Sequence, residues 1–264
     1  MLEIHFEAPS MSDGDVEGLK DQFLDHRHYN CLLGETRGED ALVYKPNGRP
    51  LLAYLSRPPG IVDVLRPALP ALRRAVKWSE ARQAYSGTVG FLEPSGRDRF
   101  GRATAFTRDR PTDWKSLQPL FLSLNDLYRR VLPEKFALQN AIARHTSDDF
   151  VIPGTCFTTA TVNGAHRFQC HRDRNNLALG MGVMTVWREE GCHIIPLIFP
   201  QWQIGVNLRC GDVLLFDGSD WHGNGPVQFI EPFERISVVC YYRCGLINCG
   251  TAAEELSKGR RLLS

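Results

Sequence analysis

Short runs of β-forming residues follow one another from residue 153 onward. Turn signals such as Asn163-Gly164, Cys210-Gly211 and Asp217-Gly218 separate them. The runs are TCFTTATVN (155–163), GVMTVW (182–187), CHIIPLIFP (192–200), QIGVNL (203–208), DVLLFD (212–217), VQFI (227–230) and RISVVCYYR (235–243). Seven or eight short strands at this spacing are typical of a sandwich or jelly roll.

The first 150 residues have a mixed pattern. Residues 41–57 predict a hairpin, because two β-rich runs flank the turn pair Asn47-Gly48. Residues 61–82 have helical apolar spacing that prolines interrupt, and residues 111–145 predict two helices, with a break at Gln118-Pro119 or Leu132-Pro133.

Together these patterns predict an α+β protein with one structural unit over residues 1–264. A double-stranded β-helix, or jelly roll, forms the core over residues 151–250. The helices of residues 1–150 pack around this core as a support region, and residues 251–264 form a C-terminal tail.

Composition narrows the class of protein only a little. The chain is 43% hydrophobic and 23% charged, and its formal net charge is +1. A core of ordinary size is therefore expected, and no global positive field points to a polyanion, although a local basic patch stays open. Residues 95–115, rich in Arg, Gly and Phe, fit either a phosphate-binding loop or a solvated loop, because acids are interspersed.

The eight cysteines include no C-x-x-C pair, the N-terminus lacks the layout of a secretory signal, and no apolar run is long enough for a membrane span. We therefore expect an intracellular protein with reduced, mostly buried thiols and no membrane partner. A zinc site built from Cys240, Cys244 and Cys249 stays an alternative, although its spacing matches no common zinc pattern.

His171, Asp173 and His222 have the order and residue types of a 2-His-1-carboxylate facial triad. Such a triad occupies one face of an octahedral Fe(II) and leaves positions for a bidentate co-substrate and O₂. Residues i and i+2 of a strand share a face, so His171 and Asp173 can point together into a barrel. His222 follows a strand and a Gly-rich turn, which would place it at the barrel mouth.

Arg235 favours the interpretation of the triad as an oxygenase site over that of a metal site without a defined function. It opens the apolar strand RISVVCYYR, and a buried guanidinium there needs an anionic partner. The distal carboxylate of 2-oxoglutarate would suit Arg235, with Ser237 on the same face as a further donor. A structural salt bridge is the alternative for Arg235, and a cupin-like barrel is the alternative for the fold. A kinase is excluded because no D-F-G or Gly-rich phosphate loop accompanies the H-R-D sequence.

The segments HRDRNN (171–176), VMTVWREEGCHIIPL (183–197) and RISVVCYYR (235–243) resemble the TET/JBP dioxygenases, which oxidise 5-methylcytosine or thymine in DNA. The resemblance implies that His171, Asp173 and His222 bind iron. It further implies that His193, Arg235 and Ser237 bind 2-oxoglutarate, that Asn176 bonds the base edge and that Tyr241 stacks on the flipped base.

Two departures from the TET pattern concern the choice of base. Arg243 stands where TET enzymes have a cytosine-contacting His, as in the thymine hydroxylases, and the TET Cys-rich extension is missing. We expect a 2-oxoglutarate- and Fe(II)-dependent dioxygenase that converts 5-methylcytosine in DNA to 5-hydroxymethylcytosine or beyond, with O₂ as co-substrate and a flipped base. The protein would be nuclear if it is eukaryotic.

Four alternatives stay open. Thymine hydroxylation and N-methyl-base demethylation use the same chemistry on DNA. A small-molecule or amino-acid hydroxylase would share the iron centre but would show no salt-dependent DNA binding. A non-catalytic barrel that reads modified bases would bind methylated DNA without iron.

Overall fold

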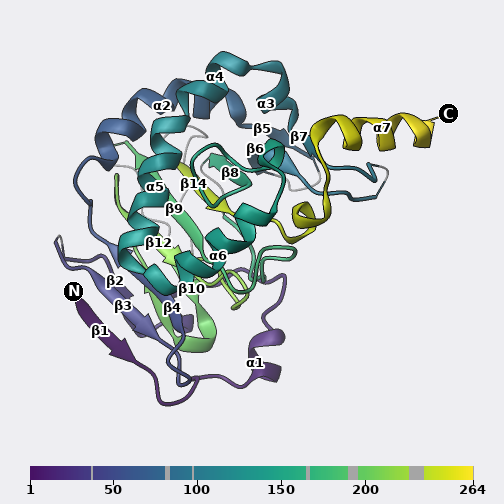
Figure 1. The fold of residues 1–264 in the computed structure, drawn as a ribbon. Helices are drawn as coiled ribbons and strands as arrows, with labels where there is room; N and C mark the ends of the chain where they lie inside the picture. Colours follow the sequence, from purple (N-terminus) through teal and green to yellow (C-terminus); the bar gives the residue numbers. More distant parts are fainter. Residues whose placement is uncertain are drawn as a thin grey trace.

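A large sheet of ten strands runs through the molecule (Figure 1). The computed structural model describes residues 1–36, 38–80, 84–96, 98–164, 167–189, 196–225 and 235–263. Neighbouring strands follow the order β1 (Leu2–His5), β3 (Ala41–Tyr44), β4 (Pro50–Leu55), β12 (Val213–Phe216), β9 (Gly182–Arg188), β14 (Arg235–Tyr241), β8 (Thr159–Gly164), β6 (Ala84–Leu92) and β5 (Lys77–Ser79), with β7 (Arg102–Ala103) paired to β6. All pairs are antiparallel except β1 with β3.

A second sheet of four short strands packs against the first. Its order is β13 (Gly223–Asn224), β10 (Leu197–Phe199), β11 (Ile204–Val206) and β2 (Cys31–Leu33). Side chains of both sheets, such as Phe199 and Val206 from the small sheet with Leu214 and Phe216 from the large one, share a single buried cluster. Two facing sheets around one core confirm the predicted double-stranded β-helix.

Helices cover the outer face of the large sheet (Figure 1). The helices on this face are α2 (Ile61–Ala75), α5 (Gln118–Val131) and α6 (Pro133–His145), with the shorter α3 (Ala105–Asp109) and α4 (Pro111–Ser116). Two helices lie elsewhere: α1 (Asp13–Glu17) contacts the turn Pro200–Trp202, and α7 (Ala252–Leu263) contacts β7. Single 3₁₀ turns lie at His26–His28, Asp148–Phe150, Pro200–Trp202 and Cys244–Asn248. The tail expected at residues 251–264 is largely α7, which runs out to the C-terminus (Figure 1).

Alternation along the central strands separates the two faces of the large sheet. On β14, Ile236, Val238 and Cys240 pack in the cluster beneath the helices. Arg235, Ser237 and Tyr241 therefore point to the opposite side, between the two sheets. The interior of the barrel thus carries polar groups from β14.

Three sequence expectations need adjustment. The prolines do not interrupt α2, because Pro67 and Pro70 are both exposed and the carbonyls they release can bond water. Residues 111–145 form three helices and not two, since both X-Pro steps end a helix. The first half also supplies six strands of the large sheet, so it is more than a helical support. The run VQFI lies outside the described residues.

Candidate active site

His171, Asp173 and His222 come together at the end of the barrel. His171 and His222 form an isolated antiparallel bridge, in which each backbone N–H donates to the other's carbonyl at 2.9 Å. The Nε2 atoms of His171 and His222 lie 3.7 and 4.0 Å from Oδ1 of Asp173. Ligand atoms of all three residues lie within 4.8 Å of one another, so one ion could contact all three.

Both imidazoles are held in the tautomer that a metal needs. Nδ1 of His171 lies 2.8 Å from the carbonyl of Gln169, and Nδ1 of His222 lies 2.9 Å from the carbonyl of Asp220. A carbonyl oxygen only accepts, so each Nδ1 carries the hydrogen and each Nε2 keeps its lone pair. Two neutral imidazoles and one carboxylate, with backbone support for both rings, match the donor set of Fe(II).

The charges of the triad favour an ionised Asp173. Burial raises the pKa of Asp173, but contact with His171 and attraction to Arg243 and to the protonated form of His222 outweigh burial, so the pKa is lowered overall. Burial lowers the pKa of His171, yet Asp173 reverses this and the pKa is raised. Burial and the neighbouring His171 lower the pKa of His222. The site therefore combines an ionised carboxylate with one imidazole whose pKa is raised, that of His171, and one whose pKa is lowered, that of His222.

The turn between Asp217 and His222 must approach Asp173 very closely. The backbone N–H of Asp173 donates to the carbonyl of Gly218 at 2.8 Å. A Cβ on Gly218 would lie 2.5 Å from Oδ2 of Asp173, which is too close for any side chain. Glycine at 218 is thus a steric requirement of the triad.

A buried ionic cluster, which the sequence did not reveal, holds this turn from behind. Nζ of Lys45, from the β3–β4 hairpin, donates to Oδ2 of Asp217 at 2.9 Å and also bonds Asp220. Nε1 of Trp202 donates to the other oxygen of Asp220 at 3.1 Å. Lys45 and both carboxylates are at most 12% exposed. The same Asp220 supplies the carbonyl that orients His222, so the cluster supports the triad.

Arg235 and Ser237 lie inside the barrel and are each 4% exposed. Arg235 stands opposite Arg188 of β9 in the strand register. Two guanidiniums facing each other across strands repel. Nη1 of Arg188 is buried and makes no hydrogen bond with any residue that the structure describes. Such an arrangement fits an anion, and the distal carboxylate of 2-oxoglutarate has the required charge.

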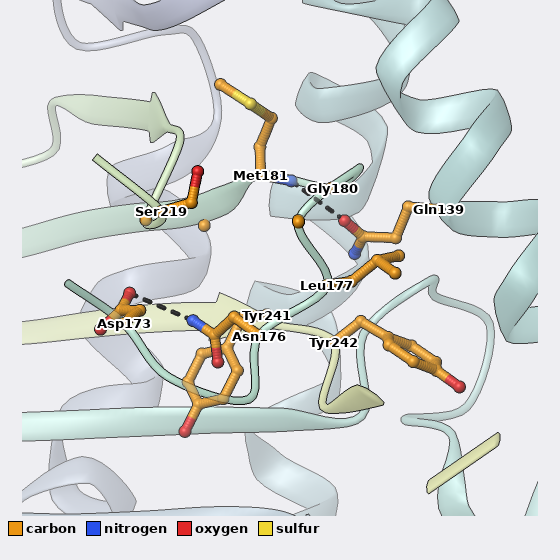
Figure 2. A pocket seen from close by; sticks show the side chains of 12 residues that line it. Gln139, Asp173, Asn176, Leu177, Gly180, Met181, Ser219, Tyr241 and Tyr242 are labelled. Carbon is orange, nitrogen blue, oxygen red and sulfur yellow. Dashed lines mark hydrogen bonds between the residues drawn. The ribbon is translucent and has the colours of Figure 1, made fainter. Parts of the chain in front are cut away.

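Asn176, Tyr241 and Arg243 gather beside Asp173. Nδ2 of Asn176 donates to Oδ2 of Asp173 at 3.1 Å, and Tyr241 lines the same small pocket (Figure 2). The hydroxyl of Tyr241 lies 3.0 Å from that of Thr161. Asn176 and Arg243 form a backbone bridge, so the two residues are neighbours.

Glu93 was not singled out from the sequence. It is buried, and Oε1 lies 3.6 Å from Nη1 of Arg243, while Oε2 accepts from the N–H of Gly245 at 2.7 Å. Nε of Arg243 is buried without a partner among the described residues. Glu93 and Arg243 are far apart in the sequence and no local pattern indicates their contact, so only the structure identifies this pair.

Four further expectations concern parts of the chain outside the pocket. His193 lies outside the described residues. In the segment 95–115, Arg102, Arg108 and Arg110 form ion pairs with Asp98, Asp109 and Asp113, so much of its positive charge is balanced locally. Among the residues that the structure describes, the cysteines form no group able to hold a metal. No described helix is long and apolar enough to cross a membrane.

Comparisons with known proteins agree with this geometry. The Tet_JBP family, the oxygenase domain of the 2OGFeDO superfamily, matches residues 93–244. The bifunctional helicase and thymine dioxygenase JBP2 of Trypanosoma cruzi is 34% identical over 186 residues, which are 67% of this chain and 16% of that protein. JBP2 of Leishmania braziliensis is 33% identical over 255 residues, which are 90% of this chain and 22% of that protein. The chain therefore spans less than a quarter of these two relatives.

A solved structure of NgTET1 in complex with 5mC DNA shares the fold. Its TM-score is 0.63 at 15% identity, and the likeness covers 95% of this chain and 100% of that one. The family match spans more than half of the chain and includes the whole triad. The chain belongs to the TET/JBP family of 2-oxoglutarate- and Fe(II)-dependent dioxygenases.

Proposed function

We propose that this protein hydroxylates the 5-methyl group of a pyrimidine base in DNA, with 5-methylcytosine as the first candidate substrate. The observation that carries the proposal is the grouping of three residues beside Asp173: Asn176 and Tyr241 line one pocket with it, and Arg243 is joined to Asn176 by a backbone bridge. A hydrogen-bonding amide, a guanidinium and an aromatic ring are the groups that recognise a flipped base by its edge and its face.

In this proposal His171, Asp173 and His222 hold Fe(II), and Arg235 and Ser237 bind the distal carboxylate of 2-oxoglutarate. When bound, iron and 2-oxoglutarate together supply the O₂-dependent oxidation of a C–H bond, with succinate and CO₂ as co-products. The protein orients the imidazoles through backbone carbonyls and encloses the reacting methyl group in a barrel that excludes bulk water. His193 is proposed as a further contact to 2-oxoglutarate on the resemblance alone.

The base edge is read by groups of different kinds. A guanidinium only donates, so Arg243 requires an acceptor on the base, whereas Asn176 offers a carbonyl oxygen to a donor. Cytosine and thymine both have one donor and acceptors on this edge, but in a different order. Thymine is the second candidate, because the JBP relatives are thymine dioxygenases and Arg243 departs from the TET pattern. A DNA substrate also implies a nuclear location in a eukaryotic cell.

The test is mass spectrometry of nucleosides after reaction with Fe(II), 2-oxoglutarate and ¹⁸O₂. One duplex carries 5-methylcytosine, and a matched duplex carries thymine as its only methylated base. We expect an ¹⁸O-labelled hydroxymethyl pyrimidine from one of them and none with the His222→Ala variant. Succinate release without any oxidised base would refute the DNA substrate and leave a small-molecule hydroxylase, whose turnover would not depend on salt in the way DNA binding does.

A further inference from the structure

The two oxygens of the Asp173 carboxylate face different partners. Oδ1 is the oxygen that lies 3.7 and 4.0 Å from the Nε2 atoms of the triad. Oδ2 accepts from Nδ2 of Asn176 at 3.1 Å (Figure 2). The same oxygen lies close to the backbone of Gly218. One oxygen is thus directed to the metal position, and the other is occupied by a neutral donor.

The chemistry of this contact fixes the orientation of the amide. An aspartate that serves as a metal ligand is a carboxylate, and a carboxylate only accepts hydrogen bonds. The amide oxygen of Asn176 would repel it, whereas the amide nitrogen donates a charge-assisted bond. Nδ2 must therefore face Asp173, and the carbonyl oxygen of Asn176 must point away from it.

The backbone around Asn176 holds the amide in place. The N–H of Leu177 donates to the carbonyl of Tyr242 at 3.0 Å, and the N–H of Cys244 donates to the carbonyl of Asn175 at 2.9 Å. These bonds tie the segment that carries Asn176 to the end of β14 on both sides of the residue. The amide is therefore presented to Asp173 by a bonded backbone and not by a free loop.

We propose that Asn176 is a positioning residue of the iron site, which keeps Asp173 a one-oxygen ligand by binding its second oxygen. This inference rests on the iron site of the proposed function and not on its DNA substrate. A carboxylate that is released from Asn176 can rotate and offer both oxygens, which changes the geometry and the strength of metal binding. Hydrogen-bonding partners behind a metal ligand typically contribute about 10- to 100-fold to metal affinity.

The proposal also joins base recognition to the metal site in one side chain. One N–H of Nδ2 is bonded to Asp173, so the second N–H and the carbonyl oxygen of Asn176 are left for a base, and the oxygen accepts from a donor such as cytosine N4–H₂ or thymine N3–H. A base bonded to that oxygen polarises the amide and strengthens its bond to Asp173.

The experiment is an anaerobic titration of the metal-free protein with Co²⁺ alone, followed by the visible absorption of the bound ion. Asn176→Ala and Asn176→Leu both remove the donor, and Leu keeps the number and branching of the side-chain heavy atoms of Asn. We expect both variants to bind Co²⁺ about 10-fold more weakly or worse, with an altered absorption spectrum. Asn175→Gly is the matched control, because Asn175 is exposed and has a positive φ of 67° that glycine accepts.

The outcomes separate this inference from the proposed function. Wild-type affinity and spectrum in both Asn176 variants would overturn it, and so would full recovery in Asn176→Leu, since the shape of the side chain alone would then explain the effect. Wild-type protein that binds no Co²⁺ would overturn the iron site itself. Thermal melts of the metal-free variants, expected to match the wild type, exclude unfolding as the cause, and no DNA or 2-oxoglutarate enters the measurement.

Discussion

Lys45→Met removes the cation of the buried cluster behind the iron site and keeps most of the side-chain volume. Lys45 is the cation that hydrogen-bonds both Asp217 and Asp220, and the next positive group, Arg49, lies 3.8 Å from Asp217 and is 46% exposed. The variant therefore leaves two nearly buried carboxylates close together with no hydrogen-bonded cation.

The expected loss of stability is large. Removing one partner of a buried ion pair costs about 3–5 kcal/mol, because the remaining charge is buried without compensation. For a chain of this size that corresponds to a fall in Tm of roughly 6–12 °C. Lys115→Met on the exposed face of α4 is the control and should change stability by no more than about 0.5 kcal/mol.

The pH dependence tests the cause of the loss. In the wild type, burial raises the pKa of Asp217, but Lys45 and Ser219 reverse this and hold the pKa below the usual value of an aspartate. Asp217 thus contributes stability above that value, which is lost as the pH falls through the lowered pKa. Without Lys45 burial dominates, the pKa of Asp217 rises and the protonated form is favoured. The loss of unfolding free energy in Lys45→Met, relative to the wild type, should therefore be largest near neutral pH and become smaller toward acid pH.

Thermal and urea unfolding of the metal-free protein measure these effects. Lys45→Met combined with Asp220→Asn should recover part of the loss, because the double variant has one buried charge fewer and still offers Trp202 an acceptor. A Tm within about 2 °C of the wild type, or a deficit that is constant from neutral to acid pH, would refute the reasoning.

Other substitutions and conditions test the remaining parts of the site. Arg235→Lys should raise KM for 2-oxoglutarate by about 10-fold or more, since Lys cannot form the bidentate bond; an unchanged KM in steady-state succinate assays would contradict the assignment. Tyr241→Ala should weaken binding of a methylated duplex by about 1–3 kcal/mol in fluorescence anisotropy, whereas Tyr241→Phe, which keeps the ring, should not. Co²⁺ affinity should begin to fall at a pH above the ordinary pKa of an imidazole, because the pKa of His171 is raised and its proton competes with the metal. The pKa of His222 is lowered, so His171 should be protonated first. A loss of Co²⁺ affinity only well below pH 6.5 would refute this order of protonation.

Local patterns predicted the elements that local forces determine. The strands from β8 to β12 and β14 were identified by alternation and turn pairs, and the hairpin of β3 and β4 by Asn47-Gly48. The pair Gly223–Asn224 is too short to show alternation, so β13 was missed. The pairing of β2 with β11 joins distant segments in parallel and has no sequence signature.

The triad was accessible from the sequence through its residue types and their order, although His171 and Asp173 do not lie on the expected strand and only an isolated bridge joins His171 to His222. The contacts that hold the triad in place were not accessible from the sequence. Lys45 and Asp217 are far apart in the chain, and nothing near either residue indicates their contact. Asn176 was expected at the base edge, but its bond to Asp173 depends on side-chain direction within the pocket, which only the structure gives. Gly218 had a signal in the Gly-rich turn, although the reason for it is the approach to Asp173.

The hairpin of β3 and β4 also protects the barrel from self-association. β4 covers the edge of β12, a strand whose four residues, VLLF, are all buried. A chain trimmed to residues 93–244, the segment that carries the family match, would keep the triad but expose this apolar edge and its unpaired backbone groups. Such a fragment is expected to aggregate by edge-to-edge pairing, and the residues upstream of 93 act as a built-in solubility element for the oxygenase core.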